Sequence, residues 1–367
     1  MRRALRLALR GQGRVEPNPM VGCVLVRAGR MVGEGFHRRF GGPHAEVEAL
    51  RRAGDAARGA TAFVTLEPCC HYGQTPPCTE ALIKAGVSRV VAAMRDPFPK
   101  VNGGGIRRLR RAGIRVEVGL CESEAGELLA PFITRVKLGR PYVILKWAQS
   151  LDGKIATRTG DSRWISDAPS RRLVHRLRAR VDGILVGAGT VLADDPELTA
   201  RATPIKRRAT RLVLDGRLRI PIESRLVSTA GECPTIVLCD EANLAEHSRK
   251  AARLRRAGVE VKGFRASREQ VPLRRVLEWL GGRGFSNLLV EGGGEVLASF
   301  VDQGMADEAL IFVSPRLIGG ALAVSALRGL GAATVQRALV FDRCVIQASG
   351  KDRLYRVRFR GSGSRLD

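Results

Sequence analysis

Segments with the hydrophobic pattern of a strand alternate with segments that have the pattern of a helix along almost the whole chain. In the first 120 residues, strand-like runs at 21–26, 62–66, 89–94 and 114–118 are separated by helix-like stretches at 45–52, 79–85 and 106–111. Strands separated by helices form a sheet with helices packed against it. The pattern therefore predicts an α/β fold.

A second series of the same kind begins near Arg140-Pro141. We expect strands at 142–145, 183–186, 212–214, 235–238, 287–290 and 308–313, helices at 170–179, 273–280 and 295–301, and a final hairpin around Ser349–Asp352. A chain of 367 residues is longer than one hydrophobic core usually organises. We therefore predict domains at 1–140 and 141–361, with a linking helix at 120–140 and a tail at 362–367.

The net charge is the unusual feature of the composition. The chain has 62 Lys+Arg against 36 Asp+Glu, a formal net charge of +26, which would suit a nucleic-acid or anionic-membrane partner. The excess is spread over both halves, and 53 of the 62 basic residues are Arg and nine are Lys, a bias that genome base composition can produce. We therefore expect small anionic ligands rather than nucleic acid.

Membrane and export signals are weak. No apolar run approaches the roughly 18 residues of a spanning helix. The Arg-rich start could be a transit peptide, but Ala4, Leu5, Ala8 and Leu9 have helical spacing, so we favour a first helix docked on the domain. Eight cysteines are too few for a disulfide scaffold. We expect a cytoplasmic protein with no membrane partner.

The sequence Pro43-His44-Ala45-Glu46 is followed by Glu67-Pro68-Cys69 and Pro77-Cys78. One imidazole and two thiolates are three of the four ligands of a tetrahedral zinc ion, and a catalytic zinc keeps its fourth position for water. That water becomes acidic enough to attack as hydroxide, and Glu46 lies close enough to His44 to act as general acid and base. Helices starting at Ala45 and after Cys69 would favour the thiolates. We therefore predict a catalytic zinc bound by His44, Cys69 and Cys78.

A structural zinc site is the main alternative, because Cys70 and His71 could supply a fourth ligand. Adjacent Cys69 and Cys70 rarely reach one metal, however, and Glu46 would then have no function. A zinc-stabilised binding protein without enzymatic activity is a further alternative.

The motifs at His44, Cys69 and Cys78, together with Pro17-Asn18-Pro19-Met20-Val21-Gly22, resemble those of the cytidine-deaminase-like zinc hydrolases. More narrowly, they resemble the bifunctional riboflavin-biosynthesis deaminase/reductase family. The spacing of nine residues between Cys69 and Cys78 distinguishes this family from base and nucleoside deaminases, which usually have Pro-Cys-x-x-Cys. A tRNA or DNA base deaminase is an alternative that the net charge of +26 would suit. Such an enzyme would have the short cysteine spacing and a groove rich in aromatic residues, whereas aromatic residues make up only 5% of this chain.

The resemblance implies that Asn18 and His71 contact the substrate of the first domain. This chain departs from the family at Gln74, where Lys or Arg is common, and at Cys70, where Ser is usual.

From Lys146 to Lys154 the chain resembles the reductase half of the same family, as it does at Asp161–Ser166, Gly187–Pro196 and Val290–Gly294. The resemblance therefore covers nearly the whole chain. It implies a cytidine-deaminase-like three-layer domain followed by a dihydrofolate-reductase-like domain. It also implies a set of contacts with NADP, namely Ala148, Trp164, Thr190, Asp194, Gly216, Gly293, Gly294, Glu295, Val296, Leu297, Ala298 and Ser299.

The run Glu291-Gly292-Gly293-Gly294-Glu295 lies between an expected strand and an expected helix. Bare backbone N–H groups at a helix start can approach a pyrophosphate, although a tight turn is the simpler explanation of the run alone. Leu297 stands where a third Gly would be, so a Rossmann fingerprint is absent. The resemblance favours the cofactor site.

Arg178 and Arg201 suit a substrate phosphate, because a guanidinium donates bidentate hydrogen bonds. A solvated surface position is the alternative for either one. By resemblance, Ser162, Leu198 and Glu291 also surround the substrate. Lys146, near the end of an expected central strand, is a candidate proton donor or a structural lysine.

The resemblance thus implies two successive reactions on a small phosphorylated pyrimidine. The first is hydrolytic deamination of 2,5-diamino-6-(5-phosphoribosylamino)pyrimidin-4(3H)-one with Zn²⁺. The second is NADPH-dependent reduction of the ribosyl to the ribityl side chain. It also favours a homodimer formed through the reductase domain.

Overall fold

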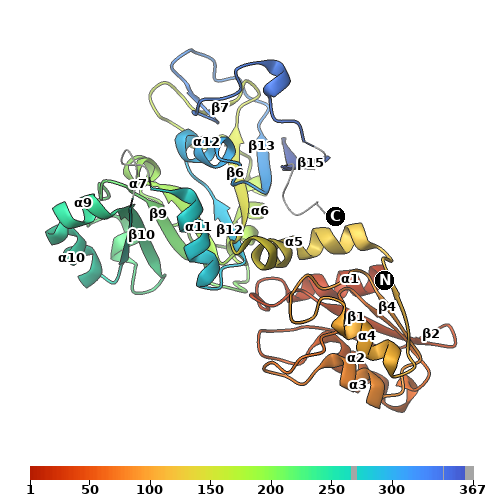
Figure 1. Ribbon diagram of the computed structural model, residues 1–367. Coiled ribbons are helices and arrows are strands. Elements are labelled where there is room, and N and C mark those ends of the chain that lie inside the picture. The colour runs from red at the N-terminus through yellow and green to blue at the C-terminus, as the bar shows by residue number, and fades with distance from the viewer. Residues whose placement is uncertain (266–270, 342, 360–367) are drawn as a thin grey trace. The chain divides into compact units, whose positions relative to one another are not determined.

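The computed structural model describes residues 1–265, 271–341 and 343–359. The chain divides into two compact units, Met1–Gly139 and the segment from Arg140 onward, one residue from the boundary expected at 140 (Figure 1). The expected end of the second domain at 361 and the tail at 362–367 lie outside the described residues. In the described part of the chain, no helix has the length and apolar character needed to cross a membrane.

The first unit is built on a five-stranded sheet in the order β2-β1-β3-β4-β5. Strand β1 is antiparallel to both β2 and β3, and β3, β4 and β5 are parallel. The strands are β1 (Gly22–Arg27), β2 (Arg30–Phe36), β3 (Thr61–Val64), β4 (Arg89–Ala92) and β5 (Arg115–Val118).

Helices cover both faces of this sheet and make a three-layer domain. They are α1 (Arg2–Ala8), α2 (Ala45–Ala53), α3 (Cys78–Lys84), α4 (Gly104–Arg111) and α5 (Glu122–Leu138), with short 3-10 turns at Leu9–Gly11 and Gly54–Ala57. Because strand residues alternate between faces, Cys23 and Leu25 pack with α2, α3 and α4, while Val24 packs with α1. Helix α5 packs through Leu129 and Ile133 on the second face.

The first helix is docked on the domain, as its spacing predicted, but its buried face differs by one position. Ala4, Leu7 and Ala8 are buried, whereas Leu9 is 49% exposed. The helix ends at Ala8, so Leu9 no longer follows the helical face.

Gly22 allows α1 to lie directly against the sheet. A Cβ atom at residue 22 would come within 2.1 Å of the Ala4 carbonyl oxygen and 2.9 Å of the Ala8 nitrogen. We expect Gly22→Ala to destabilise the domain by about 1–3 kcal/mol, because backbone atoms of α1 must move to relieve the overlap. Thermal unfolding followed by circular dichroism measures this effect.

Gly126→Ala is the matched control, since a Cβ at residue 126 of α5 meets no atom within 4 Å. It should be neutral or stabilising by up to about 1 kcal/mol, as Ala favours a helix interior over Gly. Equal melting temperatures for the two variants would contradict the close approach of α1.

The second unit is built on a nine-stranded sheet in the order β11-β10-β9-β8-β12-β6-β13-β16-β15. The seven strands from β11 through to β13 in this order are all parallel. Strands β16 and β15 form a hairpin, and β16 pairs antiparallel with β13. The strands are β6 (Tyr142–Gln149), β8 (Gly183–Gly187), β9 (Thr210–Leu214), β10 (Thr235–Asp240), β11 (Glu260–Phe264), β12 (Asn287–Val290), β13 (Glu308–Val313), β15 (Arg343–Ser349) and β16 (Asp352–Arg358). A separate pair is formed by β7 (Lys154–Ala156) and β14 (Val324–Ser325).

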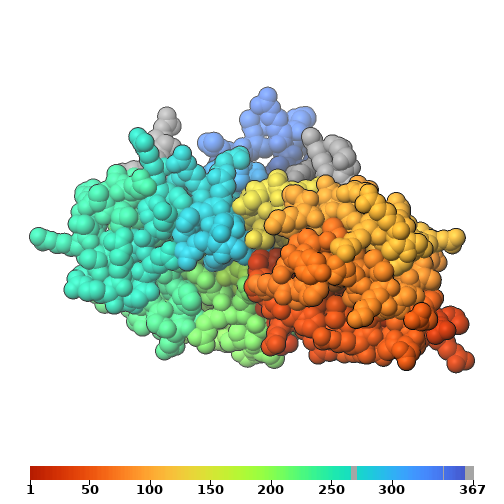
Figure 2. Space-filling view, turned by 60° about the horizontal axis from the view of Figure 1, so that its bottom comes forward, coloured from red at the N-terminus to blue at the C-terminus, as the bar shows by residue number. Residues whose placement is uncertain are grey.

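Two helical layers enclose the large sheet. Residues of α6 (Ala168–Arg178), α8 (Arg225–Ser228) and α10 (Ser248–Arg256) pack in one core cluster, and residues of α11 (Leu273–Gly282) and α12 (Gly294–Asp302) pack in the other. The remaining helices are α7 (Ala188–Asp194), α9 (Glu241–Glu246) and a 3-10 turn at Val335–Arg337. In the space-filling view, the surface of the first unit is coloured red to yellow and that of the second yellow-green to blue (Figure 2).

These two sheets with helices on both faces confirm the predicted α/β class. Most expected elements are found within two or three residues of their expected bounds, including the linking helix and the final hairpin. The sequence did not predict β2, β7, β11, β14, α7, α8, α9 or α10. Strand β2 was missed because Gly33 and Gly35 weaken its pattern, yet a Cβ at either position would come within 2.4 Å of a backbone oxygen of α2.

Candidate functional site

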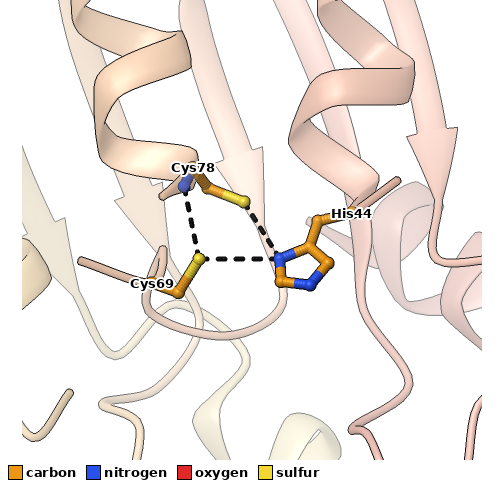
Figure 3. Close-up of side chains that lie close together, drawn as sticks. All are labelled: His44, Cys69 and Cys78. Carbon is orange, nitrogen blue, oxygen red and sulfur yellow. Dashed lines mark hydrogen bonds between the residues drawn. The ribbon is translucent and has the colours of Figure 1, made fainter. Parts of the chain in front are cut away.

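The three predicted zinc ligands meet in the first domain. The Nδ1 atom of His44 lies 3.2 Å from Cys78 Sγ and 3.5 Å from Cys69 Sγ (Figure 3). The ligand atoms of His44, Cys69 and Cys78 all lie within 4.8 Å of one another. Two segments supply them: His44 is the N-cap residue of α2, while Cys69, after β3, and Cys78, at the start of α3, flank one loop.

The chemistry of these donors fits zinc. An imidazole nitrogen and two sulfurs are a soft tetrahedral set with one position left over. Hydrogen bonds from Cys78 and from His44 lower the pKa of Cys69 to about 4, so this sulfur is a thiolate at neutral pH. The Cys70 thiol lies toward the Lys100 carbonyl oxygen at 3.8 Å and is not part of the cluster.

The helix expected after Cys69 is α3, which does not begin until Cys78. Residues 69–77 form a loop and α3 begins at Cys78 itself, so the positive end of α3 is next to the second cysteine. The backbone N–H of Cys78 donates to Cys69 Sγ at 3.2 Å, which stabilises the thiolate in place of a helix start there.

Glu67, the acidic residue of the Glu-Pro-Cys motif, holds the cysteine loop in place through its carboxylate. It accepts hydrogen bonds from the backbone N–H groups of Asp96, Gly103 and Ile106 at 2.9–3.2 Å. These bonds tie the cysteine loop to the segments after β4 and at the start of α4. Glu67 is therefore a structural residue of the site.

Glu46 lies on the first turn of α2 and is only 3% exposed. Its Oε2 atom is buried and has no hydrogen-bond partner among the described residues. Burial raises the pKa of Glu46 above the usual range of a carboxyl group. A carboxyl with a raised pKa and a free oxygen beside the candidate metal ligands can exchange a proton with a reactant.

A cavity of about 290 Å³ adjoins the cluster, and His44, Glu46 and Cys69 form part of its wall. Asn18 and His71, which the resemblance placed at the substrate, also line it. The Asn18 amide lies 3.2 Å from His37 Nε2, and the buried Nδ1 of His71 has no partner among the described residues.

The structure adds lining residues that the sequence did not single out, notably His37, Asp96 and Arg135. Burial raises the pKa of Asp96 to about 7, with further contributions from the negative charges of Glu67 and Cys69. None of these residues belongs to a recognisable motif. Only their position at strand and helix ends brings them to the cavity.

In the second domain, the predicted cofactor residues gather at one edge of the large sheet. Strands β6, β12, β8 and β9 are adjacent and parallel, so their carboxyl ends meet there. Ala148, Thr190, Gly216 and Gly293 lie near the ends of these four strands or directly after them. Ligands of open α/β sheets bind at this edge.

The N-terminus of α12 fits a phosphate group. Gly293 is the N-cap, and no side chain caps the helix. A Cβ on Gly292 or Gly294 would come within 2.7 Å of neighbouring atoms, whereas a Cβ on Gly293 would meet only Thr190 Oγ1 at 3.8 Å. The first N–H groups of α12 are therefore available to an anion.

The predicted contacts along α12 are not equivalent. Leu297 and Ala298 are 0% and 2% exposed and pack in the domain core, so their side chains offer no cofactor surface. Glu295 is exposed, and Gly293, Val296 and Ser299 are partly exposed. Leu297 packs in the core cluster with strand residues, and the Ala298 side chain faces Gly329.

The predicted cofactor residues Trp164 and Asp194 lie on exposed segments. Trp164 is 61% exposed, with the Arg171 guanidinium 4.6 Å from its ring. Asp194, at the end of α7, pairs with Arg163 at 3.6 Å.

Lys146, Arg178 and Glu291 form a largely buried group of charges. Arg178 Nε and Nη2 donate to the two Glu291 oxygens at 2.6 and 3.0 Å, and Lys146 Nζ lies 3.5 Å from Glu291 Oε2. Burial alone would raise the pKa of Glu291, but the two cations outweigh it and hold the pKa at about 2. Burial lowers the pKa of Lys146, which lies inside β6 rather than at its end as we expected.

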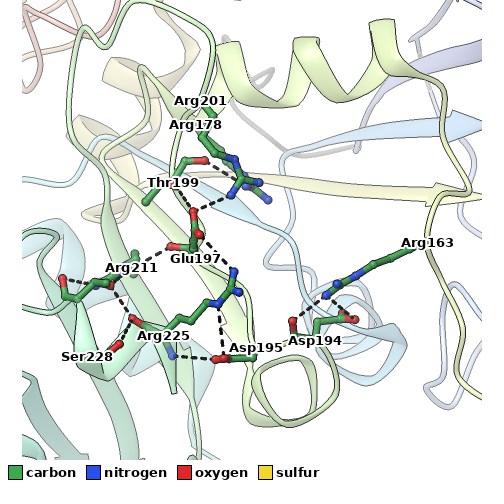
Figure 4. A network of polar contacts seen from close by, with 11 residues as sticks. Arg163, Arg178, Asp194, Asp195, Glu197, Thr199, Arg201, Arg211, Arg225 and Ser228 are labelled. Carbon is green, nitrogen blue, oxygen red and sulfur yellow. Dashed lines mark hydrogen bonds and ion pairs between the residues drawn. The ribbon is translucent and has the colours of Figure 1, made fainter. Parts of the chain in front are cut away.

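Arg178 is therefore largely buried and paired with the Glu291 carboxylate, which the sequence did not reveal. The Arg201 side chain, in contrast, is 54% exposed. Arg201 donates to Glu197, and Glu197 also accepts from Arg225 and Thr199 (Figure 4). This network holds the segment 195–201, which carries the buried Leu198 with a φ of +51°. Ser162 precedes this site in the chain and is partly exposed.

Two family models match the chain. One, described as the cytidine and deoxycytidylate deaminase zinc-binding region, matches residues 1–94, and the other, described as the RibD C-terminal domain, matches residues 141–347. The chain is 43% identical to the riboflavin biosynthesis protein RibD of Aquifex aeolicus, over 96% of this chain and 95% of that protein.

Solved structures agree with these matches. A RibD structure from Acinetobacter baumannii superposes with a TM-score of 0.85 at 36% identity, over 98% of this chain and 97% of that chain. A diaminohydroxyphosphoribosylaminopyrimidine deaminase/5-amino-6-(5-phosphoribosylamino)uracil reductase from Thermotoga maritima superposes with a TM-score of 0.83 at 39% identity, over 98% and 97% of the two chains. Identity above 30% along the whole length, with both domains matched in the same order, leaves one conclusion. The chain belongs to the RibD family of bifunctional deaminase/reductases of riboflavin biosynthesis.

Proposed function

We propose that the first domain deaminates 2,5-diamino-6-(5-phosphoribosylamino)pyrimidin-4(3H)-one with zinc and that the second reduces the ribosyl group of the product with NADPH. The cluster of His44, Cys69 and Cys78 beside Glu46, at the wall of one cavity, is the observation that carries the deaminase proposal. The substrate is a small phosphorylated pyrimidine, so neither nucleic acid nor a membrane is required.

Zinc held by His44, Cys69 and Cys78 would supply Lewis-acid activation of water at the carbon that bears the amino group. Glu46 would accept the proton of the attacking water with its free Oε2 and then donate it to the departing ammonia. Asn18 and His71 would orient the pyrimidine ring from the cavity wall. Burial of Glu46 favours this exchange, because it brings the two protonation states closer in free energy.

In the second domain, NADPH would supply the hydride that reduces C1′ of the ribosyl group. The free N–H groups at the start of α12 would bind the cofactor's phosphate, and Thr190 and Gly216 would lie along it. Lys146 would deliver the proton that accompanies reduction, with Glu291 and Arg178 fixing its position. Arg201 is better placed than Arg178 to contact the substrate phosphate, since its side chain is half exposed.

Loss of a single zinc ligand should separate the two activities. We expect Cys78→Ser to lose bound zinc and ammonia release, while NADPH oxidation with the deaminated intermediate stays within about twofold of wild type, because hydride transfer needs no metal ligand of the first domain. Elemental analysis, an ammonia assay and NADPH absorbance measure the three quantities.

Cys70→Ser is the control, since Cys70 lies one residue from a ligand but outside the cluster. It should keep zinc and both activities. A zinc-free wild-type protein with full ammonia release would reject the zinc proposal, and an active deaminase without NADPH oxidation would reject the reductase proposal.

We also propose that the protein is cytoplasmic and forms a homodimer through its second domain. Strand β15 is at the edge of the sheet, and Val345 and Ile346 on it are 43% and 57% exposed. An exposed apolar edge strand favours pairing with another chain.

A further inference from the structure

We propose that Arg135 of helix α5 binds the phosphate of the deaminase substrate, which makes α5 a wall of the catalytic cavity rather than only a connector. This inference rests on the proposed deaminase function, because it assigns one residue to one group of that substrate.

The cavity needs a positive charge to accept a phosphorylated ligand. Its wall carries the carboxyl groups of Glu46, Glu67 and Asp96. A phosphate entering this space would be repelled by any of them that is ionised. Among the described residues that line the cavity, Arg135 is the one with a permanent positive charge.

The Arg135 side chain is available for a ligand. Its Nε atom is buried and has no hydrogen-bond partner among the described residues. A buried guanidinium N–H without an acceptor costs free energy, so such a group usually has a ligand or water to bind. A guanidinium also matches two phosphate oxygens with parallel hydrogen bonds.

Helix α5 holds this guanidinium firmly at the cavity. Phe132, Arg135 and Val136 are spaced i, i+3 and i+4, so they share one face of the helix, and all three line the cavity. Leu129 and Ile133 on the neighbouring face are buried in a cluster with Leu66 and Met94. The backbone carbonyl of Arg135 accepts from Gly139, which closes the helix one turn later.

Residue 74 cannot supply the charge in this chain. Gln74 lines the same cavity but is neutral, and its side chain lies over Gly41, where a Cβ would be 2.8 Å from Gln74 Oε1. Arg135 reaches the cavity from a different element, about 60 residues further along the chain. A phosphate contact from α5 therefore compensates for a cysteine loop without a basic residue at position 74.

The test compares ammonia release from the phosphorylated substrate and from the same compound after enzymatic removal of its phosphate. Wild type, R135M, R135K and K137M are assayed as zinc-loaded, full-length proteins. Lys137 is the matched control, because it is a basic residue on the same helix that is exposed and does not line the cavity.

We expect R135M to lower kcat/KM for the phosphorylated substrate by about 10- to 100-fold, mainly through KM, the usual effect of losing a charged hydrogen bond. Its kcat/KM for the dephosphorylated substrate should stay within about twofold of wild type. R135K should recover part of the loss, and K137M should match wild type with both compounds. Ribose 5-phosphate should also inhibit R135M more weakly than wild type, while ribose inhibits both equally.

Two results would overturn the inference alone: an R135M variant that loses activity equally with both compounds, or one that loses none. The ratio of the two kcat/KM values cancels any fraction of inactive protein, so partial misfolding does not mimic phosphate recognition. A wild-type protein that releases ammonia from neither compound would instead overturn the proposed deaminase function, and the inference with it.

Discussion

Replacing Glu46 by Gln should lower kcat for ammonia release by about 10²- to 10⁴-fold, the usual range for loss of a general acid-base group. An amide cannot accept the proton of water at neutral pH, although it keeps the size of the buried side chain. The zinc content should stay the same, because His44, Cys69 and Cys78 are unchanged. NADPH oxidation with the deaminated intermediate should also be unaffected.

Glu48→Gln is the control for this variant. Glu48 lies on the same turn of α2 but pairs with Arg38 and Arg51 and does not line the cavity. It should keep ammonia release within about twofold of wild type. If Glu46→Gln retained zinc and released ammonia as fast as wild type, the assignment of Glu46 would be wrong, and a binding protein stabilised by zinc would be the better description.

Replacing Glu291 by Gln should destabilise the second domain by about 3–5 kcal/mol, because the Arg178 and Lys146 charges would then be buried without a partner. All three tryptophans, Trp147, Trp164 and Trp279, lie in this domain. Tryptophan fluorescence during urea unfolding therefore reports its free energy of unfolding separately from that of the first domain.

The effect of this substitution should depend on pH in a defined direction. The pKa of Glu291 is held at about 2, below its ordinary value of 4.5, so its ionised form stabilises the fold above pH 4.5 and this contribution falls as the pH drops toward 2. The difference in free energy of unfolding between wild type and Glu291→Gln should therefore narrow between pH 5 and pH 3.

Glu260→Gln is the control for this measurement, because Glu260 forms a half-exposed pair with Arg283 in the same domain. Its loss should cost no more than about 1 kcal/mol. A difference between wild type and Glu291→Gln that stays constant from pH 7 to pH 3 would show that the charge of Glu291 does not stabilise the buried group.

Residues that act through short motifs could be found from the sequence. His44 and Glu46 are two residues apart at a helix start, and Cys69 and Cys78 follow prolines on one loop, so local spacing alone indicated a metal centre. In these motifs neighbouring residues in the chain determine the local geometry. The Gly292–Gly294 run was different, because by itself it suited a tight turn and only the family resemblance favoured a cofactor site there.

Residues that act through distant pairing could not be found in this way. Glu291 pairs with Arg178, 113 positions earlier, and nothing near either residue indicates the pair. Asp96 and Arg135 reach the deaminase cavity only because β4 and α5 end beside it. With 53 arginines in the chain, composition could not single out Arg135 or Arg178.

The sequence by itself predicted the two α/β domains, the candidate zinc donors with Glu46 as the candidate general acid-base residue, and the family. Hydrophobic period and motif spacing are local properties, and the chain displays them directly. The tertiary structure decided which charges have partners: Glu67 and Glu291 are committed to their neighbours, whereas the Glu46 carboxylate and the Arg135 guanidinium each keep a free buried atom. Availability of a charge depends on what folding places beside it, and that is set by the packing of segments far apart in the chain.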